Sequence, residues 1–256
     1  MTSFGTDMLD PVAVAGATVP AVLVYLRIQT FLLAMPAFGE RGVPARVKVG
    51  IALALTPLFA GAAGSRDISD AVALVSAALG EAVLGFLMGM QLRLMAAVLS
   101  IAASAIAATA PLSQLVGGDN EMAPHPIGNL LHLAGLALLM AMGLPVMLAS
   151  YIDTSFTLWP SGGLPDAATV ASLMVELVIR GFGLAMVLAS PFILGGVLYQ
   201  ALAGVVGKVM PSLPIVFVGA PAAILLALTG MALFAASILG VWADAMLDLD
   251  LRAFAR

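Results

Sequence analysis

Few side chains in this sequence could carry out chemistry. His125 and His132 are the only histidines, and neither belongs to a metal-binding spacing such as HExxH. Asp119, Glu121 and His125 stand close together, but polar residues are ordinary in a solvated loop between prolines. The absence of cysteine excludes a thiol nucleophile, thiolate metal ligands and disulfide bonds. We therefore expect no enzymatic activity, no metal site and no cofactor.

Charged residues inside long apolar stretches are the other candidates, because a charge in a lipid-facing helix is costly and often functional. We expect five such buried charges: Arg27, Glu81, Arg93, Glu176 and Arg180. Glu176 and Arg180 are four positions apart, so they share a helix face and can form an ion pair. Glu81 and Arg93 would point about 120° apart on one helix, so their partners lie elsewhere. We favour structural pairing over a proton or ion relay.

The elements that must position these residues are membrane helices. Of the 256 residues, 62% are hydrophobic and only 9% are charged, which leaves too few charges to cover a water-facing surface. Several uncharged runs exceed the roughly 20 residues that cross a bilayer as a helix. The net charge of −4 argues against nucleic acid as a partner. Hydrophobic blocks, which we interpret as helices, run from Val12 to Met35, Val47 to Gly61, Ala71 to Ala110, Ile127 to Ile152, Ala168 to Val206 and Ile215 to Val241.

Two of these blocks are too long for a simple span. At about 1.5 Å per residue, Ala71 to Ala110 would measure roughly 60 Å, twice the thickness of a bilayer core. That block is either two helices or one long helix that bends or leaves the membrane. Ala168 to Val206 poses the same question, and Pro191 and the pair Gly195-Gly196 are natural break points in it.

Small residues recur along the Ala71 to Ala110 block at intervals of four. Such spacing lets helix backbones approach closely, which is the usual packing device in lipid. The partner helix can belong to this chain or to another subunit, and the pattern does not decide between them. The residues concerned are Gly85, Gly89, Ala96, Ser100, Ser104 and Ala108.

The segment from Pro111 to Pro126 joins two strongly apolar blocks and is rich in residues that break helices. A loop of this length without secondary structure is uncommon and often functional, although a plain surface connection remains the alternative. It combines apolar side chains with a pair of glycines: Leu112, Leu115, Val116, Gly117, Gly118, Asp119 and Met122.

Several segments, taken in order, resemble the FliR/SctT family of type III export-gate proteins. They are Tyr25-Leu-Arg27, Met35-Pro-Ala-Phe-Gly39, Val43-Pro-Ala-Arg46-Val-Lys48, the Gly-spaced stretch from Glu81 to Gly89, and Met210-Pro-Ser-Leu-Pro-Ile-Val-Phe-Val-Gly-Ala-Pro221. Together they cover most of the chain. In the central loop many family members have Asp-Pro, whereas Asn120 follows Asp119 here.

This resemblance implies an all-α, multi-helix integral membrane protein with long bent helices, built into a helical hetero-oligomeric pore. Residues 1–165 would resemble the larger companion gate subunit, and residues 166–256, a C-terminal helical hairpin, the small one. The partners would be several copies of each companion subunit and membrane lipid, with unfolded exported proteins as substrate. The protein would be located in the bacterial inner membrane, at the flagellar basal body or injectisome base. The Pro111–Pro126 loop would correspond to the plug that helps to close the pore.

The alternative from another class is a small-molecule or ion transporter. Such a carrier should show an internal repeat with broken helices at matching positions in its two halves. The Pro191/Gly195-Gly196 feature has no counterpart in the first half of this sequence. We therefore favour the export-gate interpretation.

Overall fold

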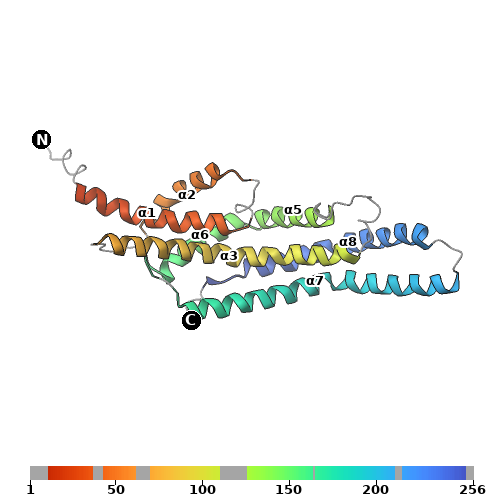
Figure 1. Cartoon of the computed structure of the whole chain (residues 1–256). Helices are drawn as coiled ribbons and strands as arrows, with labels where there is room; N and C mark the ends of the chain where they lie inside the picture. Colours follow the sequence, from red (N-terminus) through yellow and green to blue (C-terminus); the bar gives the residue numbers. More distant parts are fainter. Residues whose placement is uncertain are drawn as a thin grey trace. The chain divides into compact units, whose positions relative to one another are not determined.

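The computed structural model describes residues 11–36, 43–61, 70–109, 126–163, 165–210 and 215–251. Within these ranges the regular structure is helical, without strands (Figure 1). The helices are α1 (Pro11–Ala34), α2 (Ala45–Phe59), α3 (Ala71–Thr109), α5 (Pro126–Ala141), α6 (Leu144–Leu158), α7 (Ala167–Val209) and α8 (Ile215–Leu247).

In the part of the chain that the structure describes, three helical stretches are long and apolar enough to cross a membrane: Ala71–Ile106, Ala167–Val209 and Pro221–Leu247. The interrupted pair Gly128–Ala141 and Leu144–Leu158 makes a fourth if it is counted as one span. The prediction of an all-α, multi-helix membrane protein is therefore confirmed. The Ala71 to Ala110 block is one long helix, α3, which decides between the two alternatives for that block.

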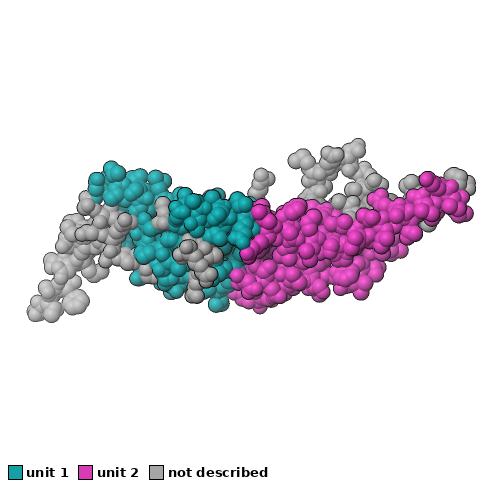
Figure 2. All heavy atoms as spheres, turned by 90° about the horizontal axis from the view of Figure 1, so that it is seen from below, with its two compact units in different colours: residues 1–94, 144–176, 249–256 teal, residues 95–143, 177–248 magenta. Residues whose placement is uncertain are grey.

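The chain forms two compact units, which Figure 2 colours separately. Unit 1 consists of Met1–Leu94, Leu144–Glu176 and Leu249–Arg256, and unit 2 of Met95–Gly143 and Leu177–Asp248. The helices α3 and α7 contribute to both. These units do not test the predicted division at residue 165, which rests on resemblance to two separate companion proteins and stays a prediction.

In unit 1, α1 packs closely against α3 because two glycines of α3 leave room for the α1 backbone. A Cβ atom added at Gly85 would lie 2.2 Å from the carbonyl oxygen of Arg27, and one at Gly89 would lie 2.7 Å from that of Phe31. The ring of Phe31 stacks against Tyr151 of α6 at a centroid distance of 6.1 Å. Unit 1 thus has a core to which α1, α3 and α6 contribute.

Unit 2 packs the second part of α3 with α5 and α8. The indole Nε1 of Trp242 on α8 donates a hydrogen bond to the carbonyl oxygen of Met95 at 3.1 Å. Gly135 of α5 faces both Trp242 and Leu99, and a Cβ atom there would lie 2.7 Å from Leu99. The fully buried side chains Leu99, Ile106 and Leu131 complete this core.

The predicted continuous helix from Ile127 to Ile152 is wrong, because α5 ends at Ala141 and α6 begins at Leu144. Gly143 separates them with a φ of 91°, a left-handed conformation that glycine adopts without steric cost. The N–H of Gly143 still bonds the carbonyl oxygen of Met140 at 3.2 Å. Pro145 then fits within the first turn of α6, where backbone N–H groups have no helical partner.

The Ala168 to Val206 block is also one long helix, since α7 runs through the natural break point at Pro191. Proline cannot donate to the carbonyl four residues earlier, here that of Val187. The hydroxyl of Ser190 donates to this carbonyl oxygen at 2.7 Å instead. A side-chain hydroxyl that satisfies the freed carbonyl allows a membrane helix to continue past proline.

Asp166 precedes the first residue of α7 and caps its N-terminus. One carboxylate oxygen accepts hydrogen bonds from the N–H of Thr169 at 2.9 Å and from its hydroxyl at 3.1 Å. These bonds hold the pKa of the Asp166 carboxyl below its usual value, and the bond from the Thr169 N–H contributes most. The cap explains why α7 starts immediately after the Trp159–Pro165 turn sequence.

Candidate functional site: a buried arginine–glutamate pair in unit 1

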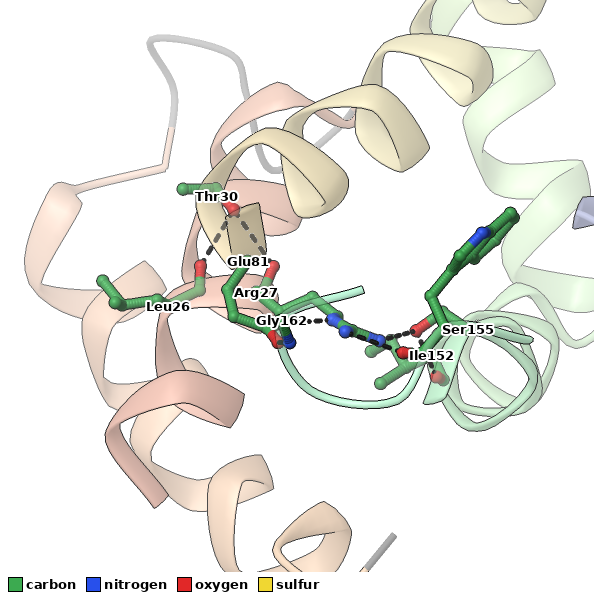
Figure 3. Close-up of polar contacts among 8 residues, drawn as sticks. Leu26, Arg27, Thr30, Glu81, Ile152, Ser155 and Gly162 are labelled. Atoms are coloured by element: carbon green, nitrogen blue, oxygen red, sulfur yellow. Dashed lines mark hydrogen bonds and ion pairs between the residues drawn. The ribbon is translucent and has the colours of Figure 1, made fainter. Parts of the chain in front are cut away.

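The most extensive polar cluster in the described residues surrounds Arg27, in the middle of α1. Its side chain is almost completely buried, and its Nε lies 2.5 Å from Oε2 of Glu81 on α3. The Nη1 atom donates to the hydroxyl of Ser155 on α6 at 3.2 Å, and Nη2 to the carbonyl oxygen of Trp159 at 3.0 Å. Figure 3 shows the guanidinium extending from α1 towards α6. Every nitrogen of this buried cation therefore has a partner.

The other oxygen of Glu81 binds the turn that follows α6. Oε1 accepts a hydrogen bond from the N–H of Gly162 at 2.7 Å. The turn is closed by the N–H of Gly163, which donates to the carbonyl oxygen of Pro160 at 2.8 Å. Gly162 has a φ of 79°, which a type II turn requires at its third position and which favours glycine. The carboxylate thus joins the α1 cation to a turn with a specific backbone shape.

Apolar and backbone contacts enclose the pair. The guanidinium carbon of Arg27 lies 4.0 Å from the centroid of the Phe156 ring, a cation–π contact. The Arg27 carbonyl lies against Gly85, where any larger residue would clash. Thr30 donates its hydroxyl hydrogen within α1, to the carbonyl oxygen of Leu26 at 2.8 Å.

This arrangement is suited to holding helices together. Both carboxylate oxygens accept hydrogen bonds and the guanidinium is bonded at each nitrogen, so the cluster offers no free acid or base to a substrate. A second buried contact lies in the same unit, where the hydroxyl of Tyr151 donates to Oε1 of Gln91. Groups of three or more side chains that could hold a metal ion do not occur among the described residues.

The sequence singled out Arg27 and Glu81 but not the residues that bind them. Ser155, Phe156 and Gly162 are of types that occur throughout the chain, and their positions give no signal by themselves. In the sequence, the stretch Ser161-Gly162-Gly163 was the one sign that the backbone of this turn takes an unusual shape.

The other predicted charges lie elsewhere. Arg93 is an exposed residue of α3 whose Nη1 reaches the carbonyl oxygen of Ala34 at 3.4 Å. Glu176 and Arg180 both lie on α7 and are exposed on the chain. These three side chains face away from the core of the chain itself. Their burial by lipid or by other subunits stays a prediction. The pairing of Glu176 with Arg180 stays a prediction.

The small residues of α3 divide into two groups. Gly85 and Gly89 pack against α1 within this chain. Ser100 and Ser104 are exposed and Ala96 is half-buried, while the side chain of Ala108 lies outside the described part. A role of this second group in contacts with another subunit stays a prediction.

The predicted plug residues fall outside the described residues. Their assignment stays a prediction for Leu112, Leu115, Val116, Gly117, Gly118, Asp119 and Met122.

Comparison with known proteins matches residues 18–249 to the family of bacterial export proteins, family 1. The flagellar biosynthetic protein FliR of Caulobacter vibrioides is 30% identical over 235 residues, which cover 90% of this chain and 93% of that protein. These matches span both compact units and the whole of the arginine–glutamate cluster.

The fold defines a multi-helix membrane protein, and the buried ion pair of Arg27 and Glu81 is the centre of the most extensive polar cluster in its described part. The chain belongs to the bacterial export proteins of family 1, the FliR/SctT family. It is a component of the type III protein export gate, as the sequence predicted. Nothing in these matches supports the alternative of a small-molecule or ion transporter.

Proposed function

We propose that this chain is a non-enzymatic pore subunit that assembles with companion membrane subunits, several copies of each, in the bacterial inner membrane. Unfolded flagellar proteins are its substrates, and it passes them outward without altering them. The observation that carries this proposal is the match along almost the whole chain to a flagellar biosynthetic protein. Residues 1–165 and 166–256 correspond, in this proposal, to the larger and the smaller companion.

The chemistry of the described residues supports a role without catalysis. Arg27 and Glu81 bind each other and the surrounding backbone, which leaves them no free position for a reacting group. A general acid or base must reach the substrate within hydrogen-bond distance, directly or through one water. The buried pair has no such access.

The length and surface of α3 support assembly with companions. Its 39 residues correspond to about 58 Å of helix, well beyond the roughly 30 Å of a bilayer core. Large apolar side chains remain exposed along its first half, with exposed fractions of 73% for Val72, 62% for Leu79 and 53% for Phe86. Lipid alone cannot cover a helix of this length, so other protein subunits would cover the remainder.

Deletion of the gene tests the proposal. We expect the deletion strain to retain flagellar hook and filament proteins inside the cell, and a plasmid copy of the wild-type gene to restore their export. Export should be measured as the amount of these proteins in the culture medium relative to whole cells. Secretion of a periplasmic enzyme by the general pathway is the control. Normal hook and filament export by the deletion strain would refute the proposal.

A further inference from the structure

Unit 2 contains a cavity of about 190 Å³ between α7 and α8. It exists because residues without long side chains face each other across the two helices, among them Gly195 and Gly196 of α7 and Ala227 and Gly230 of α8. The rings of Phe192 and Phe234, which also line the cavity, meet edge to face with centroids 6.3 Å apart. The two helices lie side by side in Figure 1.

The lining of this cavity is almost entirely hydrocarbon. None of its residues is ionisable near neutral pH, and the hydroxyls are those of Tyr199 and Thr229. The Thr229 hydroxyl already donates to the carbonyl oxygen of Leu225 at 2.7 Å. A buried water needs two to four polar partners, so this cavity is a poor site for water or for a charged ligand. Left empty, it would deprive its lining of packing contacts.

The rim of the cavity is apolar and exposed. Leu226 and Leu233 line it with exposed fractions of 51% and 69%, and both helices qualify as membrane spans. Leu194 and Leu198, on the same stretch of α7, are exposed as well. Within the bilayer core, a cavity with such a rim opens towards hydrocarbon.

We propose that the cavity between α7 and α8 binds one acyl chain of a membrane phospholipid. Its volume exceeds the roughly 150 Å³ of an apolar protein cavity that takes up benzene. Because none of the described residues that line it is charged, the tail of the lipid is held and the headgroup is not selected. An acyl chain is flexible and needs no polar partner, which suits a described lining whose polar side-chain groups are the hydroxyls of Tyr199 and Thr229.

Filling the cavity from within tests this proposal. A Cβ atom at Gly195 meets no other atom within 4 Å, so Gly195→Leu places a side chain in the cavity without a backbone clash. Gly204→Leu on the same helix is the matched control, because Gly204 also has open space and does not line the cavity. Gly195→Ala fills less of the space and should have an intermediate effect.

The measurement is native mass spectrometry of the assembled export complex, purified in mild detergent and titrated with dioleoyl phosphatidylglycerol or phosphatidylethanolamine. We expect one retained lipid per copy of this chain, bound equally with either headgroup, and at least a tenfold loss of retention in Gly195→Leu but not in Gly204→Leu. Unchanged retention in Gly195→Leu, or strong preference for one headgroup, would overturn the proposal. Loss of companion subunits from Gly195→Leu with lipid retention unchanged would instead identify a companion side chain as the occupant.

Discussion

Glu81 connects two parts of unit 1 that are distant in sequence. One carboxylate oxygen receives the Arg27 guanidinium and the other receives the N–H of Gly162, just before α7 begins. A buried ion pair contributes little net stability when complete, because desolvation offsets the attraction, but the loss of one partner leaves a charge stranded. We therefore infer that the pair fixes one arrangement of α1, α3 and the turn that leads into α7.

The ion pair predicts non-additive effects of substitution. Arg27→Leu and Glu81→Leu should each lower the free energy of unfolding by about 3–5 kcal/mol, because each leaves an uncompensated buried charge. The double substitution should cost only about 1–3 kcal/mol, which reflects the unsatisfied N–H of Gly162. Thermal unfolding of the full chain in detergent is the measurement. If the losses of the single variants simply add, the two side chains do not act as a pair.

The candidate site could be predicted only in part at this scale. Apolar surroundings identified Arg27 and Glu81 as costly charges, and helix geometry correctly excluded Arg93 as a partner of Glu81. The actual partners are 54 positions apart on different helices, and periodicity along one helix carries no information about such a contact. Apolar surroundings in the sequence also do not show whether a charge lies inside the chain, because Glu176 and Arg180 have such surroundings and are exposed on it.

Among the helices, the contact of α1 with α3 depends on Gly85. A methyl group at this position would lie 2.2 Å from both the Arg27 carbonyl oxygen and the Thr30 hydroxyl oxygen, so the two helices must move apart. We expect Gly85→Ala to lower the free energy of unfolding by about 1–3 kcal/mol, as overpacking does. Gly50→Ala is the control in the same unit, since a Cβ atom there meets nothing within 4 Å. That variant should be unchanged or up to about 1 kcal/mol more stable. Equal stability of both variants in detergent would contradict the close contact.

The continuity of α7 depends on Ser190. Its hydroxyl donates a hydrogen bond to the Val187 carbonyl oxygen. Pro191 cannot donate this bond because proline has no backbone N–H. Ser190→Ala should therefore lower the free energy of unfolding by about 0.5–1.5 kcal/mol. In the background of Pro191→Ala, which restores the backbone N–H, the same substitution should have almost no effect. A loss of equal size in both backgrounds, measured by thermal unfolding in detergent, would show that the hydroxyl does not compensate for the proline.

Helix positions were largely predictable because apolar runs in lipid must form helices, but continuity was not. A sequence cannot show that Ser190 satisfies the carbonyl left free by Pro191, so the sequence left open whether the helix continues there. At Gly143 a continuous helix was predicted wrongly, because a single glycine between apolar residues resembles the many glycines that stay helical. Hydrogen bonding and backbone conformation at single residues decided both cases.

At the scale of the whole molecule, large apolar side chains stay exposed along several helices, such as Leu79 on α3, Val197 on α7 and Leu225 on α8. A water-soluble protein rarely exposes apolar patches of this extent. Lipid and companion subunits are the two environments that could cover them. Lipid adapts to any surface, whereas a companion helix requires close approach, so substitutions of small exposed residues distinguish the two.

Ser104 is the position at which a substitution best distinguishes contact with lipid from contact with a companion helix. Its side chain is exposed, and its hydroxyl already donates to the carbonyl oxygen of Ser100 at 2.8 Å. The chain itself therefore has no further need of the hydroxyl, and what Ser104 offers a neighbour is its small size. We expect Ser104→Leu to leave the thermal unfolding midpoint of the isolated chain unchanged.

In the export complex, Ser104→Leu should at least halve the fraction of this chain that co-purifies with the companion subunits, because leucine prevents close backbone approach. Ser76→Leu is the matched control: Ser76 is also an exposed serine of α3 whose hydroxyl bonds its own helix, at the Ala73 carbonyl, and it lies outside the small-residue group. Mass measurement of the intact complex, purified in mild detergent, reports both outcomes. A complex that assembles fully with Ser104→Leu would show that this face of α3 meets lipid, which accommodates leucine as readily as serine.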